Sequence, residues 1–166
     1  MTNSSSLKCL LINLQHSMVA AAALHQLMRE LDLDIIFVQE PYVTRNGQIA
    51  DILPEYSSFH RLDPNHRYGS AIIYKTSLNC LHLVDHSSNE IARIEVKCHS
   101  HPISCYSLYC RPLHESASDF ISPLLLRPDF KKRNSILCLD ANAHSPLWNS
   151  NFTDTKGRYF VFLHKL

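Results

Sequence analysis

The stretch LKCLLINLQHSMVAAAALHQLMRELDLDIIFVQEP, residues 7–41, decides the fold of this chain. Residues 7–14 are an apolar run of strand length, and residues 34–39 are a second run rich in β-branched and aromatic side chains. Between the two runs, Ser17 offers an N-cap, and apolar residues then recur at helical spacing. Pro41 ends the second strand and favours extended backbone at Glu40. The stretch therefore predicts a βαβ unit, with both of its strands near the middle of a sheet.

Several consecutive strands are predicted after a loop at residues 44–56. They span residues 57–62, 70–75, 81–85, 91–98 and 103–109. The strand at residues 91–98 is the clearest, because apolar residues at its even positions alternate with Arg93, Glu95 and Lys97. This alternation predicts that the three charged side chains face water.

The last part of the chain predicts a helix, a strand and a second helix. Ser116 or Ser118 caps a helix that reaches about Leu126, a strand follows at residues 135–139, and the apolar segment from Gly157 onward resembles the start of a helix. The order of all these elements predicts an α/β fold of two packed β-sheets flanked by helices. The final apolar segment has no evident partner, so we expect the domain to be incomplete at its C-terminus.

Composition predicts one globular domain, with a polar tail at residues 1–6 and a partial domain at residues 7–166. Lys and Arg number 16 against 15 Asp and Glu, so net charge alone does not indicate a nucleic-acid partner. No apolar run has the character of a signal peptide or a membrane span, so we expect an intracellular protein that does not bind membranes. The six cysteines contain no C-x-x-C pair, which favours reduced side chains over zinc ligands or disulfides.

The scarcity of glycine excludes several enzyme classes. Only Gly47, Gly69 and Gly157 are present, and they are far apart in the sequence. Neither a P-loop nor a G-x-G-x-x-G fingerprint can be built from them, and H-E-x-x-H and G-x-S-x-G are also absent. Phosphate-cradling nucleotide folds, zinc proteases of this type and standard serine hydrolases are therefore excluded.

Four apolar strands end at residues suited to phosphate or metal chemistry: Asn13, Glu40, Tyr109 and Asp140. Functional sites of layered α/β proteins gather at one set of strand ends, because the loops converge there on a rigid sheet. A phosphodiester requires a cation held by oxygen ligands, and neutral donors aimed at the oxygens that gain charge. This set of side chains predicts such a site.

Each of these residues also has an ordinary structural explanation. Asn13 could be a turn residue, Glu40 a loop carboxylate, and Tyr109 a half-buried aromatic with a hydrated hydroxyl. Asp140 and Asn142 could form an Asx turn. The functional hypothesis rests on the ordered occurrence of these residues after successive strands.

Five segments carry a family resemblance: LINLQHS, DIIFVQEPYV, RYGSAIIY, SLYCRP and LDANAHSPLWNS. They resemble successive blocks of the endonuclease/exonuclease/phosphatase superfamily, which includes pancreatic deoxyribonuclease, apurinic-site endonucleases, inositol polyphosphate 5-phosphatases and sphingomyelinases. VQEPYV and DANAHSPLWNS resemble in particular the apurinic-type endonuclease domain of non-LTR retrotransposons. The resemblance implies a deoxyribonuclease-like, four-layer α/β/β/α sandwich.

The resemblance also implies a reaction, hydrolysis of a DNA strand with Mg²⁺ or Mn²⁺. Glu40 would be the metal ligand, supported by Asn13, and Asp140 would orient or deprotonate the attacking water. Tyr109 would donate its hydroxyl to the scissile phosphate, and Asn142 would stabilise the oxygens of the phosphorane. A full-length protein of this kind would carry a C-terminal reverse transcriptase domain and act in the nucleus.

Two further residues are candidates for substrate binding. His144 lies in the N-A-H stretch of the resemblance, where packing of the loop explains it equally well. Arg111 lies two residues past Tyr109, where it could meet a phosphate.

A basic cluster at residues 127–133 is either a solvated loop or a contact to the DNA backbone. His99 and His101 are explained by a hairpin turn more simply than by a metal.

Two departures from the family pattern lower the expected activity. Leu139 stands where the family usually has glycine, and nothing after Asn142 matches the family's later Asp or its Ser-Asp-His block. Losing an acid–base partner costs on the order of 10²–10⁴-fold in rate, so we expect this chain alone to be weakly active or inactive. Two alternative functions remain open: a non-catalytic remnant, decayed or domesticated, and a phosphatase-branch enzyme acting on small phosphodiesters.

Overall fold

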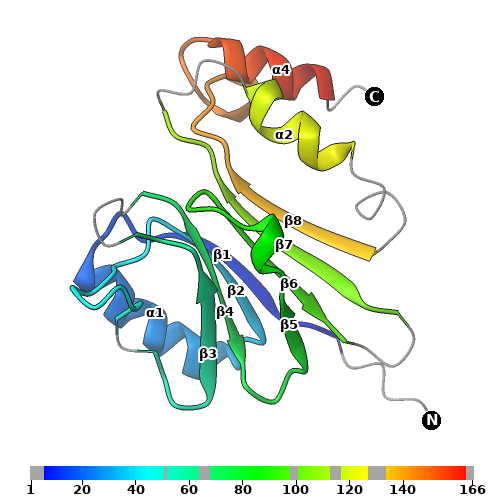
Figure 1. The fold of residues 1–166 in the computed structure, drawn as a ribbon. Coiled ribbons are helices and arrows are strands. Elements are labelled where there is room, and N and C mark those ends of the chain that lie inside the picture. The colour runs from blue at the N-terminus through cyan, green and yellow to red at the C-terminus, as the bar shows by residue number, and fades with distance from the viewer. Residues whose placement is uncertain are drawn as a thin grey trace.

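The computed structural model describes residues 6–50, 52–63, 68–97, 101–112, 117–126 and 134–163. Within these residues the chain forms two mixed β-sheets of four strands each (Figure 1). The first sheet has the order β1 (Cys9–Asn13), β2 (Ile35–Gln39), β4 (Ser70–Lys75) and β3 (Tyr56–His60). The second has the order β5 (Cys80–His82), β6 (Ile91–Val96), β7 (Ile103–Tyr109) and β8 (Asn134–Asp140).

Helices flank the two packed sheets on both sides. Helix α1 (Met18–Leu31) packs on the outer face of the first sheet, and its N-terminus is capped by the Ser17 hydroxyl, as predicted. Helix α2 (Ala117–Leu125) lies against the second sheet, and helix α4 (Thr155–Leu163) packs on α2 (Figure 1). Two short 3-10 helices, η1 (Val84–His86) and η2 (Pro146–Trp148), lie in loops. The predicted α/β/β/α sandwich is confirmed.

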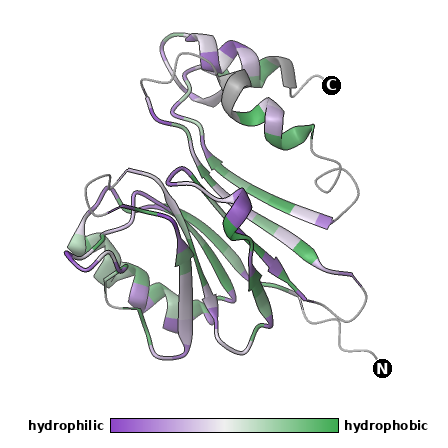
Figure 2. Cartoon of the chain, in the orientation of Figure 1, coloured by the Kyte–Doolittle hydropathy of each residue, from purple (hydrophilic) through white to green (hydrophobic). Residues whose placement is uncertain are grey.

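Strand β2 is the centre of the hydrophobic core. Ile36 and Val38 pack under α1, whereas Ile35 and Phe37 point into the layer between the sheets. All four side chains are fully buried, which explains why the sequence of this strand shows no polar alternation. Figure 2 shows the same pattern, with hydrophobic residues concentrated in the strands.

Parallel pairing brings the predicted site residues to the same end of both sheets. β1 pairs parallel with β2, which sets Asn13 beside Gln39 immediately before Glu40. β7 pairs parallel with β8, which sets Tyr109 beside Asp140. The carboxyl ends of these two strand pairs therefore carry four of the predicted residues.

Two predictions about the strands are wrong. β1 is an edge strand of the described first sheet rather than a central one, because β2 pairs on its other side with β4. Arg93 does not face water: it is buried, and its guanidinium carbon lies 4.9 Å from the centre of the Tyr106 ring. The outer face of the second sheet is covered there, and the cation–π contact compensates part of the cost of burying Arg93.

Most predicted elements occur with shifted ends. The last helix begins at Thr155 instead of Gly157, and the helix before β8 contains Pro123. Among the described residues, Cys9, Cys110 and Cys138 are free thiols. In the part of the chain that the structure describes, no helix is long and apolar enough to cross a membrane. The basic cluster at residues 127–133 and His99 lie outside the described residues.

A buried polar seam, formed by Gln39, Ser70 and Ser107, joins the two sheets below the strand ends. Gln39 Nε2 donates to Ser107 Oγ at 3.1 Å, and Ser70 Oγ lies 2.7 Å from the Ser107 carbonyl oxygen, to which it donates. Ser70 Oγ also accepts a hydrogen bond from Ala92 N. The seam crosses from β2 and β4 to β6 and β7, so it fixes how one sheet sits over the other.

Replacing Ser70 by Ala should destabilise the protein by about 1–3 kcal/mol, because Ala92 N would lose its buried acceptor and the Ser107 carbonyl would lose a donor. Denaturant unfolding measures this difference. The control is Ser58→Ala on β3, outside the seam, which should change the free energy of unfolding by no more than about 0.5 kcal/mol. Equal effects of the two substitutions would contradict the role of the seam.

Candidate active site

A hydrogen bond between the side chains of two residues, one from each sheet, lies at the centre of the candidate site. Asn13, the last residue of β1, donates from Nδ2 to Asp140 Oδ2 at 2.7 Å. Asp140 is the last residue of β8, so two residues 127 positions apart in sequence meet directly. The contact joins the carboxyl ends of the two sheets.

Both partners are also turn residues, which confirms the structural interpretation of each. Asn13 Oδ1 accepts from Gln15 N at 2.9 Å, and Asp140 Oδ1 accepts from Asn142 N at 3.1 Å. These are two Asx turns, which bend the chain away from the sheet just past each strand. The Asp140 carboxylate is therefore oriented through both of its oxygens.

Tyr109 links the remaining predicted residues. It is 1% exposed, and its hydroxyl hydrogen-bonds both the Glu40 carboxylate and the Asn142 side chain. Burial raises the pKa of the Tyr109 hydroxyl well above its ordinary value, and the hydrogen bond to Glu40 raises it further. Tyr109 therefore keeps its proton and is a neutral hydrogen-bond donor at any physiological pH.

Glu40 does not have the extended backbone predicted from the proline that follows it. Its φ is 47°, in the left-handed region. Two backbone hydrogen bonds hold this conformation: Glu40 N donates to Gly69 O at 2.8 Å, and Glu40 O accepts from His16 N at 2.9 Å. These bonds to two other loops outweigh the local preference imposed by Pro41.

The four residues predicted from the strand ends and Asn142 thus form one hydrogen-bonded network: Asn13, Glu40, Tyr109, Asp140 and Asn142. A cleft of about 680 Å³ opens beside it. Its lining includes Asn13, Asp140, Asn142 and His144, whereas Glu40 and Tyr109 lie in the network outside this lining. Both sheets contribute to the network and to the cleft.

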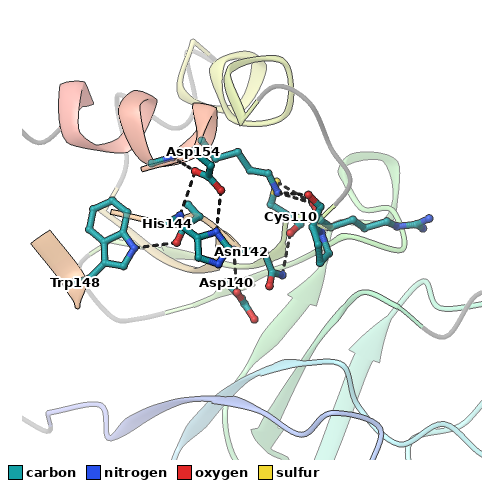
Figure 3. Close-up of polar contacts among 11 residues, drawn as sticks. Cys110, Asp140, Asn142, His144, Trp148 and Asp154 are labelled. Atoms are coloured by element: carbon teal, nitrogen blue, oxygen red, sulfur yellow. Dashed lines mark hydrogen bonds and ion pairs between the residues drawn. The ribbon is translucent and has the colours of Figure 1, made fainter. Parts of the chain in front are cut away.

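His144 belongs to a compact arrangement of its own, shown in Figure 3 with Asp140, Asn142 and Cys110 close by. Its Nδ1 lies 2.9 Å from Asp154 Oδ2, and its ring stacks on Phe152. Burial raises the pKa of Asp154, but hydrogen bonds from Gly157 N and from the His144 ring and backbone outweigh burial and lower that pKa to about 2.

Arg111 is held away from the centre of the network. Its Nε lies 2.7 Å from Glu90 Oε1, and the Arg111 side chain is partly exposed. The guanidinium is therefore paired with a carboxylate beside the site. Arg111 therefore lies next to the network, but its charge is paired with the Glu90 carboxylate.

Sequence reasoning missed His16, which contacts Glu40 directly. His16 Nε2 lies 3.6 Å from Glu40 Oε2, its Nδ1 lies 3.2 Å from the Pro41 carbonyl oxygen, and its ring packs edge-on against Tyr68. Only the place of His16 within the LINLQHS segment could have indicated it. Lys156 and Asp154 were also missed, because they precede the predicted start of the last helix.

Comparison with known proteins identifies the family. The model of the endonuclease/exonuclease/phosphatase family matches residues 10–162. This chain belongs to that family, whose members are typically hydrolytic nucleases or phosphatases and generally use divalent metals. Among curated proteins, none matches the sequence.

Solved structures share the fold. The endonuclease domain of TRAS1, a telomere-specific non-LTR retrotransposon, has a TM-score of 0.77 at 24% identity, covering 95% of this chain and 68% of that chain. The catalytic domain of Xenopus laevis APE2 has a TM-score of 0.63 at 19% identity, covering 94% and 67%. A family protein from Bacteroides thetaiotaomicron has a TM-score of 0.56 at 17% identity, covering 96% and 68%.

The low pKa of Asp154 predicts a pH-dependent contribution to stability. The folded-state pKa of about 2 lies below the ordinary value of 3.8, so the ionised carboxylate stabilises the fold above that value. This contribution is lost as the pH falls toward 2. The difference in Tm between wild type and Asp154→Asn should therefore be largest near pH 6 and shrink toward pH 2. A constant difference across this range would contradict the assignment.

Gly157 allows α4 to approach the loop that follows β8. A Cβ at Gly157 would lie 1.8 Å from the His144 carbonyl oxygen. Gly157→Ala should therefore destabilise the protein by about 1–3 kcal/mol, although alanine within a helix normally stabilises. Thermal unfolding would show a lower Tm for this variant than for Arg158→Ala, which alters the exposed neighbouring residue of the same helix. A raised Tm would show that the two backbones are not in close contact.

Proposed function

We propose that this chain is the DNA-nicking endonuclease domain of a non-LTR retrotransposon. It would hydrolyse phosphodiester bonds with Mg²⁺ as its cofactor, and Mn²⁺ is the alternative metal. One observation carries the proposal: the hydrogen-bonded network that runs from Asn13 through Asp140, Asn142 and Tyr109 to Glu40. It places two carboxylates, a protonated phenol and two amides at one end of both sheets. This is the set of groups that hydrolysis of a phosphate diester requires.

The chemistry of the oxygen ligands fits a hard divalent cation. Glu40 and Asp140 supply carboxylate oxygens, and Asn13 supplies an amide oxygen beside them. In the described residues no group of three or more His, Cys, Asp or Glu could hold a metal. Mg²⁺ is usually bound by only one or two carboxylates, with water and substrate phosphate completing its coordination. We therefore assign Glu40 as the main ligand, with Asn13 supporting it. When bound, the cation would neutralise charge on the phosphate.

Asp140 is suited to act on the attacking water. The amide of Asn13 and the backbone N–H of Asn142 both donate to its carboxylate, so each of its two oxygens is fixed in position. An ionised carboxylate fixed in orientation can accept a proton from a water molecule aligned with the phosphorus. In this proposal Asp140 orients and deprotonates that water.

Tyr109 and Asn142 supply neutral donors to the phosphate oxygens. The raised pKa keeps the Tyr109 hydroxyl protonated, so it adds no negative charge beside the anionic substrate. Asn142 is held by donation from Nδ2 to Cys110 O at 3.1 Å and by its contact with Tyr109. Preorganised donors of this kind stabilise the charge that develops on the oxygens as water attacks.

The choice of DNA as substrate is supported by the likeness to the retrotransposon endonuclease domain of TRAS1. The structural similarity itself concerns the fold, so the substrate is part of the proposal. A reverse transcriptase domain in the full-length protein and a nuclear site of action belong to the same proposal, because a retrotransposon must reach chromosomal DNA. In this proposal His144, which lines the cleft, and Arg111, which is paired with Glu90, contact the flanking substrate.

Plasmid nicking tests this function. We expect slow conversion of supercoiled to nicked plasmid with Mg²⁺ and excess protein, and its loss on chelation. Glu40→Gln and Asp140→Asn should each lower the rate on the order of 10²–10⁴-fold, because each removes a carboxylate that acts on the metal or the water. The matched control is Glu55→Gln, which alters an exposed carboxylate outside the network and should keep the wild-type rate.

Nicking that survives both Glu40→Gln and Asp140→Asn would exclude this site. Hydrolysis of inositol phosphates without cleavage of DNA would instead assign the chain to the phosphatase branch of the family.

A further inference from the structure

A buried lysine near the start of α4 holds the chain that follows Tyr109. Lys156 is 4% exposed, and its Nζ donates to the carbonyl oxygens of Arg111 at 2.7 Å and Pro112 at 3.0 Å. Burying an ammonium group and ordering a long side chain both cost free energy. The two charge-assisted hydrogen bonds offset that cost by fixing two successive carbonyls just past β7.

The residues around Lys156 hold the second site loop, the one that follows β8. Asp154 caps α4 by accepting from Gly157 N at 2.6 Å, and its carboxylate also accepts from His144 N and contacts the His144 ring. Asp154 N donates in turn to His144 O at 3.2 Å. Together with the close approach of Gly157 to that carbonyl, these contacts attach the loop firmly to the helix.

The two loops are also joined to each other. Cys110 N donates to Asp140 O at 2.9 Å, and Asn142 Nδ2 donates to Cys110 O at 3.1 Å (Figure 3). Successive carbonyls after β7 are thus held by Asn142 and then by Lys156. Helix α4 is itself attached to α2 through the hydroxyls of Ser122 and Tyr159, which lie 3.0 Å apart.

We propose that Asp154 and Lys156, the α4 clamp, are positioning residues for the candidate active site. The clamp fixes the backbone that follows Tyr109 and the backbone that follows Asp140. It thereby sets the distance from the Tyr109 hydroxyl and the Asn142 amide to the Asp140 carboxylate. Neither clamp residue is assigned a contact with the substrate. The inference rests on the proposed function for its effect on rate, but its structural part can be tested without any activity.

The clamp predicts a loss in the rate at saturating DNA, because misplacing catalytic groups by a fraction of an ångström acts on the transition state more than on binding. Lys156→Met keeps the length of the side chain and removes its donors. We expect kcat to fall about 10- to 100-fold, the range for residues that support catalytic groups, with KM changed about threefold or less.

Lys75→Met is the matched control. Lys75 is also half-buried and bonded, to Asp32 and Asp34, but it lies at the opposite end of the first sheet from the network. Losing these contacts should lower Tm without lowering kcat. A purely structural role for Lys156 would give the same result as this control, which would overturn the proposal.

Hydrogen exchange supplies a readout that does not depend on nicking. In Lys156→Met, amides in peptides covering residues 109–112 and 140–144 should exchange faster, whereas Lys75→Met should leave both peptides unchanged. Unchanged exchange in Lys156→Met would overturn the clamp whether or not the chain cleaves DNA. Faster exchange in Lys156→Met would support the structural part of the clamp whether or not the wild-type chain nicks DNA.

Asp154→Asn provides a second variant if Lys156→Met does not fold. The amide keeps an acceptor for the backbone donors but loses the second carboxylate oxygen that contacts His144 Nδ1. Faster exchange at residues 140–144, together with a fall in kcat at nearly constant KM, supports the clamp. Wild-type values of both quantities would overturn it.

Discussion

The buried hydrogen bonds between Gln39, Ser70 and Ser107 are the constraint on which the rest of the structure depends. Apolar contacts hold the two sheets together but do not fix one relative position, because hydrophobic attraction has no direction. Hydrogen bonds in a buried environment do have direction, and breaking them leaves polar groups without partners. The candidate site takes residues from both sheets, so a small slide between them would separate Asn13 from Asp140. The seam lies just below that contact and prevents such a slide.

Strained backbone conformations are concentrated in the loops that follow the site strands. Gln15, His16, Glu40 and Asn142 all have positive φ, and each lies within three residues of the end of a site strand. Non-glycine residues rarely adopt this conformation and do so at a cost of order 1–3 kcal/mol each, so surrounding contacts must hold them. The backbone bonds of Glu40 to Gly69 and His16 supply such contacts. The consequence is that sharp turns bring the polar side chains over the strand ends.

The sequence was sufficient to predict the strands, the layers and the five residues of the network, because strand-length apolar runs ending in polar side chains specify both a sheet and its functional edge. It did not predict the burial of Arg93 or the backbone of Glu40. Alternation cannot indicate that Arg93 packs on the ring of Tyr106 in the neighbouring strand, and the preference imposed by Pro41 is local, whereas the opposing hydrogen bonds come from distant loops. Lys156 was missed for the same reason, since its partners are backbone carbonyls 44 and 45 residues away.

The sheets and the last helix constrain different parts of the candidate site. Parallel pairing of β1 with β2 and of β7 with β8 fixes where the strands end, and the seam fixes the distance between the two pairs. Neither determines the direction in which the chain leaves each strand, yet that direction sets the position of Asn142. Helix α4 supplies the missing constraint, because it binds the backbone after Tyr109 and the backbone after Asp140 at the same time. A site built on turns can be as precise as one built on strands when a single rigid element holds both turns.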